Sequence, residues 1–149
     1  MEFNEDLDEV EITPTTVDMD TVNGLVYALI KALGEDPDRE GLKSTPHRVS
    51  RMFTELLCGY TMDPQKVING ALFNITYDEM VLVRDIEFYS LCEHHMLPFL
   101  GRAHVAYIPG KHGRICGLSK RSRVVDVFAN RPQVQERLTA QIADTIGED

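Results

Sequence analysis

The chain has 149 residues, a length that suits one domain and is too short to suggest two. Of these residues 43% are hydrophobic and 26% are charged, a composition typical of a soluble globular protein. It has no apolar run as long as a membrane span, no basic leader of the signal-peptide type, and only three widely spaced cysteines, which do not form a disulfide framework. We therefore expect a cytoplasmic protein that has no membrane partner and whose thiols are buried or bind metal.

Charge is distributed unevenly along the chain. Residues 1–20 contain eight of the 24 acidic side chains and no basic one, so the remainder is nearly neutral although the net charge is −9. Within that remainder, residues 101–123 carry six basic side chains and no acidic one. Such a positive stretch favours an anionic ligand, although a solvated loop would have the same composition. It lacks the interleaved aromatics and basic helix of a DNA reader, which disfavours nucleic acid as a partner.

The N-terminal part predicts a tail and two helices. Residues 1–17 lack periodicity and are too charged to pack, so we expect a mobile tail followed by one domain over residues 18–149. Asp18 or Asp20 can cap a first helix, which Gly34 ends. Its apolar positions recur at helical spacing: Val22, Leu25, Val26, Leu29, Ile30 and Leu33. Ser44-Thr45-Pro46 begins a second helix, with a hydroxyl as N-cap and proline at the first helical position, and Gly59 ends it.

The second half predicts two strands followed by two helices. Residues 80–89 and 101–108 are rich in valine, isoleucine and aromatics at strand length, and residues 119–130 and 133–146 have helical spacing. This order indicates an α+β fold with an antiparallel pair of strands. Two strands alone would leave their edges unpaired, and the last helix ends in acidic residues where its dipole favours a cation. We therefore expect other chains, or strands missing after Asp149, to complete the sheet.

Cys92-Glu93-His94-His95 follows the first strand and is the strongest candidate for a metal site. Cys92 and His95 are three residues apart, so one turn brings a thiolate and an imidazole to the same side, and both are good zinc ligands. His94, with an unperturbed pKa of about 6.5, suits proton transfer beside that metal. A lone Cys-x-x-His is half of a zinc site, and a packed cysteine with surface histidines remains an alternative.

Two further groups suggest nucleotide binding. Gly117-Leu118-Ser119-Lys120 puts a helix N-terminus directly before cations, and Arg123 shares a face with Lys120. Helix capping explains Ser119 equally well, but basic residues in a first turn reverse the usual preference, as Arg48 also does in the second helix. Gln135 and Glu136 begin the last helix, where a carboxylate could match two N–H donors of a guanine edge, although a solvated first-turn acid is the simpler interpretation.

Taken together, four motifs resemble those of GTP cyclohydrolase I. They are Ser44-Thr45-Pro46-His47-Arg48, Ser90-Leu91-Cys92-Glu93-His94-His95, Gly117-Leu118-Ser119-Lys120 and Arg131-Pro132-Gln133-Val134-Gln135-Glu136-Arg137-Leu138-Thr139, and the similarity runs from about residue 22 to residue 146. The resemblance implies that Cys92 and His95 are zinc ligands and that His94 is the catalytic acid and base. It also implies that Arg48, Lys120 and Arg123 bind the triphosphate of GTP, with Ser119 near the ribose and phosphates. Gln135 and Glu136 would recognise guanine.

The resemblance further implies a fold, an assembly and a reaction. The family has the tunnelling fold (T-fold), in which an antiparallel sheet has helices on one face, and it forms a homodecamer with sites at subunit interfaces. Its reaction opens the imidazole ring of GTP and yields 7,8-dihydroneopterin triphosphate and formate, which serves tetrahydrofolate and pterin biosynthesis. In the family a later His-x-Cys segment supplies the third zinc ligand, and this sequence has neither that segment nor the last two strands. A non-catalytic member that retains nucleotide or subunit contacts is therefore the alternative.

Overall fold

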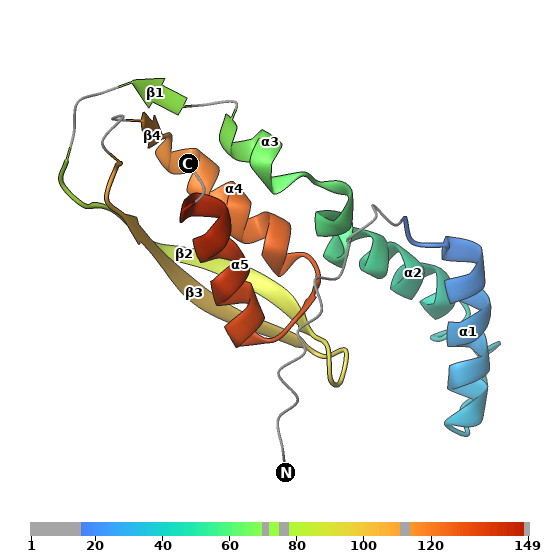
Figure 1. The fold of residues 1–149 in the computed structure, drawn as a ribbon. Coiled ribbons are helices and arrows are strands. Elements are labelled where there is room, and N and C mark those ends of the chain that lie inside the picture. The colour runs from blue at the N-terminus through green and yellow to red at the C-terminus, as the bar shows by residue number, and fades with distance from the viewer. Residues whose placement is uncertain (1–15, 70–71, 75–77, 111–113, 148–149) are drawn as a thin grey trace, which may run out of the picture.

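The structure is a computed structural model that describes residues 16–69, 72–74, 78–110 and 114–147 (Figure 1). Nearly all of the predicted tail lies outside these residues. The elements in chain order are α1 (Met19–Ala32), α2 (Thr45–Leu56), a 3₁₀ turn η1 (Cys58–Thr61), α3 (Pro64–Asn69), β1 (Leu72–Asn74), β2 (Val81–Cys92), β3 (Pro98–Tyr107), β4 (Arg114–Cys116), α4 (Leu118–Ala129), β5 (Pro132–Gln133) and α5 (Gln135–Gly147). The fold is α+β, as the sequence predicted.

Helix α1 begins and ends where its sequence predicts. Asp18 is the N-cap, and its carboxylate accepts a hydrogen bond of 3.1 Å from the backbone N–H of Thr21. At the other end Gly34 takes a φ of 85°, in the left-handed region that glycine enters without steric cost. The helix therefore ends at Ala32 because the following residues turn the chain away.

Helix α2 differs from the prediction in its details. Its N-cap is Ser44, but the hydroxyl makes no capping hydrogen bond, and Pro46 is the second helical residue instead of the first. A missing N–H costs nothing in the first turn, because that group has no partner within the helix. The helix ends at Leu56, and Gly59 lies within the 3₁₀ turn that follows.

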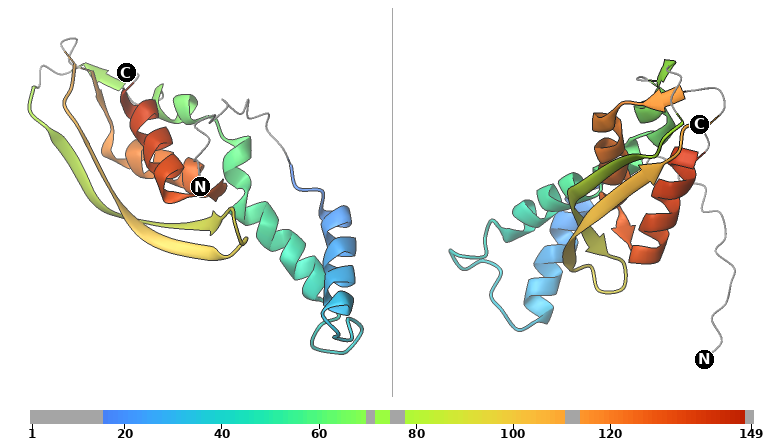
Figure 2. Two further views of the ribbon diagram at one scale, coloured as in Figure 1. Left: turned by 60° about the horizontal axis from the view of Figure 1, so that its bottom comes forward. Right: turned by 90° about the vertical axis from the view of Figure 1, so that its left-hand side faces the viewer.

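The core lies between a small sheet and two helices that cover one of its faces (Figures 1 and 2). Strands β2 and β3 pair antiparallel from Val81↔Tyr107 to Leu91↔Pro98, with a register shift where Asp85 adopts a φ of 57°. The side chains that form the core come from both layers: Ile86 and Val105 from the sheet, Val124, Val125 and Phe128 from α4, and Leu138 and Ile142 from α5. Burial of these apolar side chains supplies the main driving force for the packing of α4 and α5 on the sheet.

The sheet has more strands than the sequence predicted. Strand β5 pairs parallel with the end of β2, giving the order β3-β2-β5, and β1 pairs with β4 in a separate two-stranded sheet. Strands of two or three residues are too short to show an alternating pattern, so periodicity could not reveal them. The predicted antiparallel pair is confirmed, and it is part of a three-stranded sheet.

Helices α1 and α2 pack against each other to one side of the sheet and its two helices (Figure 2). In α1 only Ile30 is buried, whereas Leu25, Leu29 and Leu33 of the same apolar stripe are 55–74% exposed. The stripe therefore has too few partners within this one chain. Among the described residues, no helix combines the length and the apolar character that crossing a membrane requires.

Gly59 allows η1 to approach the end of α4 closely. A Cβ at this position would lie 2.1 Å from the carbonyl oxygen of Val127 and 2.7 Å from that of Asn130. We expect Gly59→Ala to lower the free energy of unfolding by about 1–3 kcal/mol, because backbone must move to admit the methyl group.

Gly24 is the matched control, since it lies inside α1 and a Cβ there would meet nothing within 4 Å beyond its own chain neighbours and helix backbone. The same change at Gly24 should raise the free energy of unfolding by about 0.5–1 kcal/mol, because alanine is the better helix former. Urea unfolding of both variants tests the pair. Equal effects at the two positions would contradict the close approach at Gly59.

Candidate functional site

The Cys92-Glu93-His94-His95 segment forms the tight loop that joins β2 to β3. The N–H of Cys92 donates to the carbonyl of Leu97 at 2.8 Å, and the N–H of Met96 donates to the carbonyl of Cys92 at 2.7 Å. Met96 adopts a φ of 54°, a conformation that a residue other than glycine seldom takes. Local hydrogen bonds therefore hold the loop in a defined shape, and we call residues 92–97 the metal loop.

The metal loop brings the two predicted zinc ligands together. Cys92 Sγ and His95 Nδ1 are 4.0 Å apart, close to the separation of about 3.6 Å that two such atoms have on a tetrahedral zinc ion. Within the described residues, no group of three or more histidine, cysteine, aspartate or glutamate side chains could hold a metal. These donors thus fit half of a zinc site, and a stable site requires at least one further protein ligand.

His94 lies next to these donors and remains accessible. Its side chain is 65% exposed, its Nε2 is 3.9 Å from a carboxylate oxygen of Glu93, and its ring is 6.3 Å from the ring of His95. The planes of the two rings are nearly perpendicular, at 87°. This is the arrangement expected of a proton-transfer group beside a metal.

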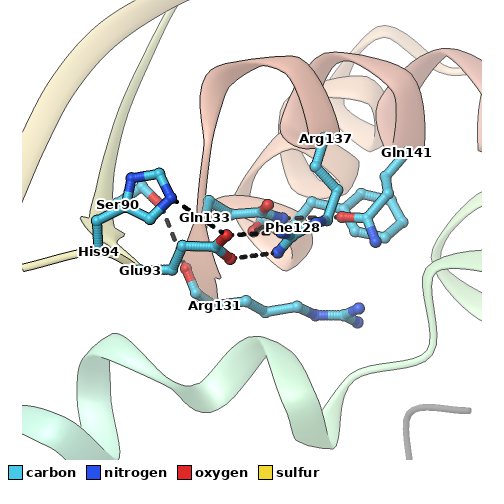
Figure 3. Close-up of polar contacts among 8 residues, drawn as sticks. All are labelled: Ser90, Glu93, His94, Phe128, Arg131, Gln133, Arg137 and Gln141. Atoms are coloured by element: carbon cyan, nitrogen blue, oxygen red, sulfur yellow. Dashed lines mark hydrogen bonds and ion pairs between the residues drawn. The ribbon is translucent and has the colours of Figure 1, made fainter. Parts of the chain in front are cut away.

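Glu93 makes a bidentate ion pair with Arg137 of α5 (Figure 3). The two guanidinium nitrogens donate to the two carboxylate oxygens at 2.5 and 2.8 Å. The hydrogen bonds from Arg137 hold the pKa of Glu93 below its usual value, and the carboxylate in turn raises the pKa of Arg137. Both carboxylate oxygens of Glu93 therefore face Arg137 of α5.

Buried polar contacts fix β5 beneath the metal loop (Figure 3). The hydroxyl of Ser90 donates to the carbonyl of Arg131 at 3.3 Å, and Arg131 donates twice to the carbonyl of Gly59, at 2.9 and 3.2 Å. Gln133 donates from Nε2 to the carbonyl of Phe128 and to the side chain of Gln141. The segment between α4 and α5 is therefore tied to β2, to η1 and to both helices.

The predicted guanine-binding residues lie at the same end of the sheet as the metal loop. Gln135 and Glu136 are the first two residues of α5, and both side chains are exposed. Arg137 follows them directly and contacts Glu93, and the N–H of Glu93 donates to the carbonyl of Gln133 at 3.2 Å. The structure thus brings Gln135 and Glu136 next to the segment that carries Cys92, His94 and His95.

Three of the predicted phosphate-binding residues lie in the first two turns of α4: Ser119, Lys120 and Arg123. The N-cap of this helix is Gly117, which has no side chain to cap the helix, and the first turn has no acidic residue. Capping therefore does not explain Ser119, which is exposed and lies inside the helix. Lys120 is partly buried and Arg123 is exposed, whereas the neighbouring Arg121 is fully buried, with its guanidinium 4.1 Å from the ring centre of Tyr107.

These residues lie far from the metal loop within the chain. Tyr107, against which Arg121 packs, pairs with Val81 at the start of β2, whereas Cys92 is the last residue of that strand. A strand of 12 residues is roughly 35 Å long. Arg48 is exposed in the first turn of α2, which lies to the side of the sheet (Figure 1). The structure does not bring Arg48, Lys120 and Arg123 to the metal loop of the same chain.

Sequence reasoning assigned no role to Glu93 or Arg137, although both lie in the motifs that carry the resemblance. The two are 44 residues apart, and nothing in the sequence pairs one acid with one base over that distance. The available signal was indirect: Glu93 lies between predicted site residues, and Arg137 comes directly after Glu136.

Comparison with known proteins agrees with the geometry. The family model of GTP cyclohydrolase I matches residues 22–149. Proteins named GTP cyclohydrolase 1 are 58% identical over 128 residues in Chlorobium phaeovibrioides and 61% identical over 121 residues in Chlorobaculum tepidum. These matches cover 86% and 81% of this chain but 56% and 53% of the two relatives, so the chain spans about half of their length. The relative from Carboxydothermus hydrogenoformans is 56% identical over 132 residues, which are 89% of this chain and 68% of that protein. The chain belongs to the GTP cyclohydrolase I family.

Proposed function

We propose that the chain acts as a GTP cyclohydrolase I, which opens the imidazole ring of GTP by hydrolysis and forms 7,8-dihydroneopterin triphosphate and formate. The observation that carries this proposal is the contact between the metal loop and the first turn of α5, through Glu93 and Arg137. Metal donors, a proton-transfer histidine and the predicted guanine-binding residues then share one end of the sheet. Membership of the family supports the same reaction.

Zinc is the cofactor that the donor set favours. Cys92 and His95 would hold it, because a thiolate and an imidazole 4.0 Å apart suit a tetrahedral ion of this kind. When bound, zinc supplies the Lewis acidity that activates water for attack at C8 of guanine. His94, exposed beside these two residues, would accept and return protons as the ring opens and formate leaves.

The substrate is held at two places that lie apart in one chain. Glu136 and Gln135 would bind the guanine edge, and Ser119, Lys120, Arg123 and Arg48 would bind the ribose and triphosphate. The first turn of α4 has no acidic side chain and no side-chain cap. Its backbone N–H groups and the positive end of the helix dipole therefore favour an anionic ligand there. Since one chain does not bring the two groups together, a complete site would combine residues from more than one copy.

The proposed assembly is therefore a homo-oligomer with sites between subunits, and the family suggests a decamer with the T-fold over residues 18–149. The exposed leucines of α1 support such an assembly, because an apolar stripe of this kind usually marks a protein–protein contact. One edge of β3, which has no neighbouring strand among the described residues, supports it too, since edge strands offer unpaired backbone groups to a partner. We propose a cytoplasmic location, in keeping with a soluble family.

A second function is favoured by one observation. The described residues supply two metal donors, whereas zinc sites in proteins use at least three. On that basis the alternative is a non-catalytic family member that keeps nucleotide or subunit contacts. Metal content and turnover separate this alternative from the enzyme.

The first test measures bound zinc and formate release from GTP on the purified chain. We expect bound zinc and formate release, with the further zinc ligand coming from outside the described residues of one chain. We expect Cys92→Ser to lower the affinity for zinc by about tenfold or more, because a neutral hydroxyl is a far weaker zinc ligand than a thiolate. Cys58→Ser is the matched control, since Cys58 lies in η1, outside the metal loop, and its loss should leave zinc binding unchanged.

The outcome that favours the alternative is a chain without zinc and without turnover. The same assays would then be repeated on an extended chain, continued with the C-terminal part of the Chlorobaculum tepidum relative that this sequence does not match. If the extended chain also fails to bind zinc and release formate, the proposed activity is wrong.

A second test concerns guanine recognition. Replacing Glu136 with glutamine should weaken GTP binding by about 10–100-fold, because a hydrogen bond to a charged group contributes about 1.5–3 kcal/mol. Zinc content should not change, since Glu136 is not among the metal donors. Glu55→Gln, an exposed acid on α2, controls for the loss of one negative charge. Equal losses of zinc and GTP in the Glu136 variant would show that this residue belongs to the metal site instead.

A further inference from the structure

The Glu93–Arg137 ion pair differs from the other ion pairs between described residues. Arg39–Glu35 and Lys66–Asp63 join residues within one short segment, and their side chains are 46–86% exposed. Arg102 contacts Asp85 and Glu87 at 3.5–3.6 Å on an exposed surface. Glu93 and Arg137 are 28% and 35% exposed, and they interact through two short hydrogen bonds.

Exposure and hydrogen-bond geometry determine whether an ion pair stabilises or orients the segments that it joins. An exposed ion pair contributes little, because water screens the charges and two long side chains lose their freedom. A bidentate guanidinium–carboxylate contact also fixes the relative orientation of its partners, since both groups are planar and meet along two parallel bonds. The Glu93–Arg137 pair is therefore suited to fix the distance and the relative orientation of the two segments that carry it, the metal loop and α5.

The pair joins the two segments whose spacing matters to the proposed reaction. Glu93 lies between Cys92 and His94, and Arg137 follows Glu136 directly. On the loop side, hydrogen bonds from Cys92 and Met96 close the turn, so a force on the Glu93 side chain acts on the whole loop. On the helix side, the exposed first turn of α5 has Arg137 as its side-chain contact to the metal loop.

We propose that the Glu93–Arg137 pair is a positioning contact that sets the distance and orientation between the metal loop and the guanine-binding turn of α5. The inference rests on the proposed function for what the two segments bind. Arg137 and Glu93 touch neither substrate nor metal in this role. They act through Cys92, His94 and His95 on one side and through Gln135 and Glu136 on the other.

Loss of the Glu93–Arg137 pair should lower the rate of catalysis more than the affinity for GTP. Guanine can still be held by Gln135 and Glu136 if the pair is broken, because their side chains are unaffected. The reacting carbon would then lie at a variable distance from His94 and from the metal donors. A misplacement of about 1 Å can cost on the order of 100-fold in rate, so turnover should fall while affinity for GTP is kept.

The test compares one chemical change at two ion pairs. Arg137→Lys keeps the positive charge but cannot form the two parallel hydrogen bonds, and Arg39→Lys makes the identical change in the exposed pair with Glu35. Glu93→Gln removes the other partner, and the double variant Glu93→Gln/Arg137→Lys completes a cycle. If the two residues act as one contact, the double variant should lose no more than the worse single one.

The first readout is hydrogen–deuterium exchange of the metal-free chain, which needs no activity. We expect exchange to become at least about fivefold faster at the amides of Cys92, Glu93, Met96 and Leu138 in Arg137→Lys. Amides of β3 in the core and the whole of Arg39→Lys should exchange as in the unchanged chain. Unchanged exchange at the metal loop, or a uniform rise across all amides, would overturn the positioning role.

The second readout separates kcat from the dissociation constant for GTP, in whichever of the original or extended chain releases formate. We expect kcat to fall about 10–100-fold in Arg137→Lys and Glu93→Gln, while GTP affinity stays within about threefold. Loss of affinity with unchanged kcat would overturn the proposal. If exchange rises locally but neither form releases formate, the positioning contact stands and the proposed function fails.

Discussion

The parallel pairing of β5 with the end of β2 determines how the rest of the site is arranged. Only Leu91↔Pro132 and Cys92↔Gln133 are paired, yet these positions join the metal loop to the segment that connects α4 with α5. Buried polar groups that lacked partners would be costly, and here the hydroxyl of Ser90, the guanidinium of Arg131 and the amide nitrogen of Gln133 find theirs in neighbouring backbone. The register of this short strand thus fixes where α5 begins. The Glu93–Arg137 pair then orients the first turn of α5, which carries the proposed guanine-binding residues, against the metal loop.

Whereas β5 brings the metal loop and α5 together, the length of α4 separates other groups that the proposed reaction needs together. Its first turn, with Ser119 and Lys120, lies near the start of β2, and its last residue leads toward β5 and the metal loop. A 12-residue helix is about 18 Å long, so one chain presents the proposed phosphate-binding residues Ser119 and Lys120 and the proposed guanine-binding residues at opposite ends. The exposed leucines on α1 also support an assembly of several chains, as does the edge of β3, which has no neighbouring strand among the described residues. The single chain contains the parts of a site, and an assembly of chains would place them around one substrate.

The longer elements of this fold could be predicted from the sequence, and the connections that build the site could not. Helical spacing and β-branched runs predicted α1, β2, β3, α4 and α5 to within a few residues, because each buries a regular face. The strand β5 has two residues and no period, and its role depends on pairing with Leu91 and Cys92, each 41 positions from its partner. Among the proposed site residues, Cys92 and His95 could be paired from the sequence because three-residue spacing is a local property. Glu93–Arg137 is a long-range contact, so only the folded chain reveals it.

The metal loop also shows why a weak local pattern can mark a well-defined structure. Cys-x-x-His alone fits many packed cysteines, and its chemistry depends on what surrounds it. Here the surroundings are specific: a φ of 54° at Met96, a closed turn, and a carboxylate of Glu93 that is paired with Arg137. A free carboxylate between Cys92 and His95 would itself be a metal ligand, and it could draw the loop into another shape. By engaging both oxygens of Glu93, Arg137 gives this carboxylate a partner in α5, and the helix that carries the proposed guanine-binding residues is thereby linked to the loop that carries the proposed metal donors.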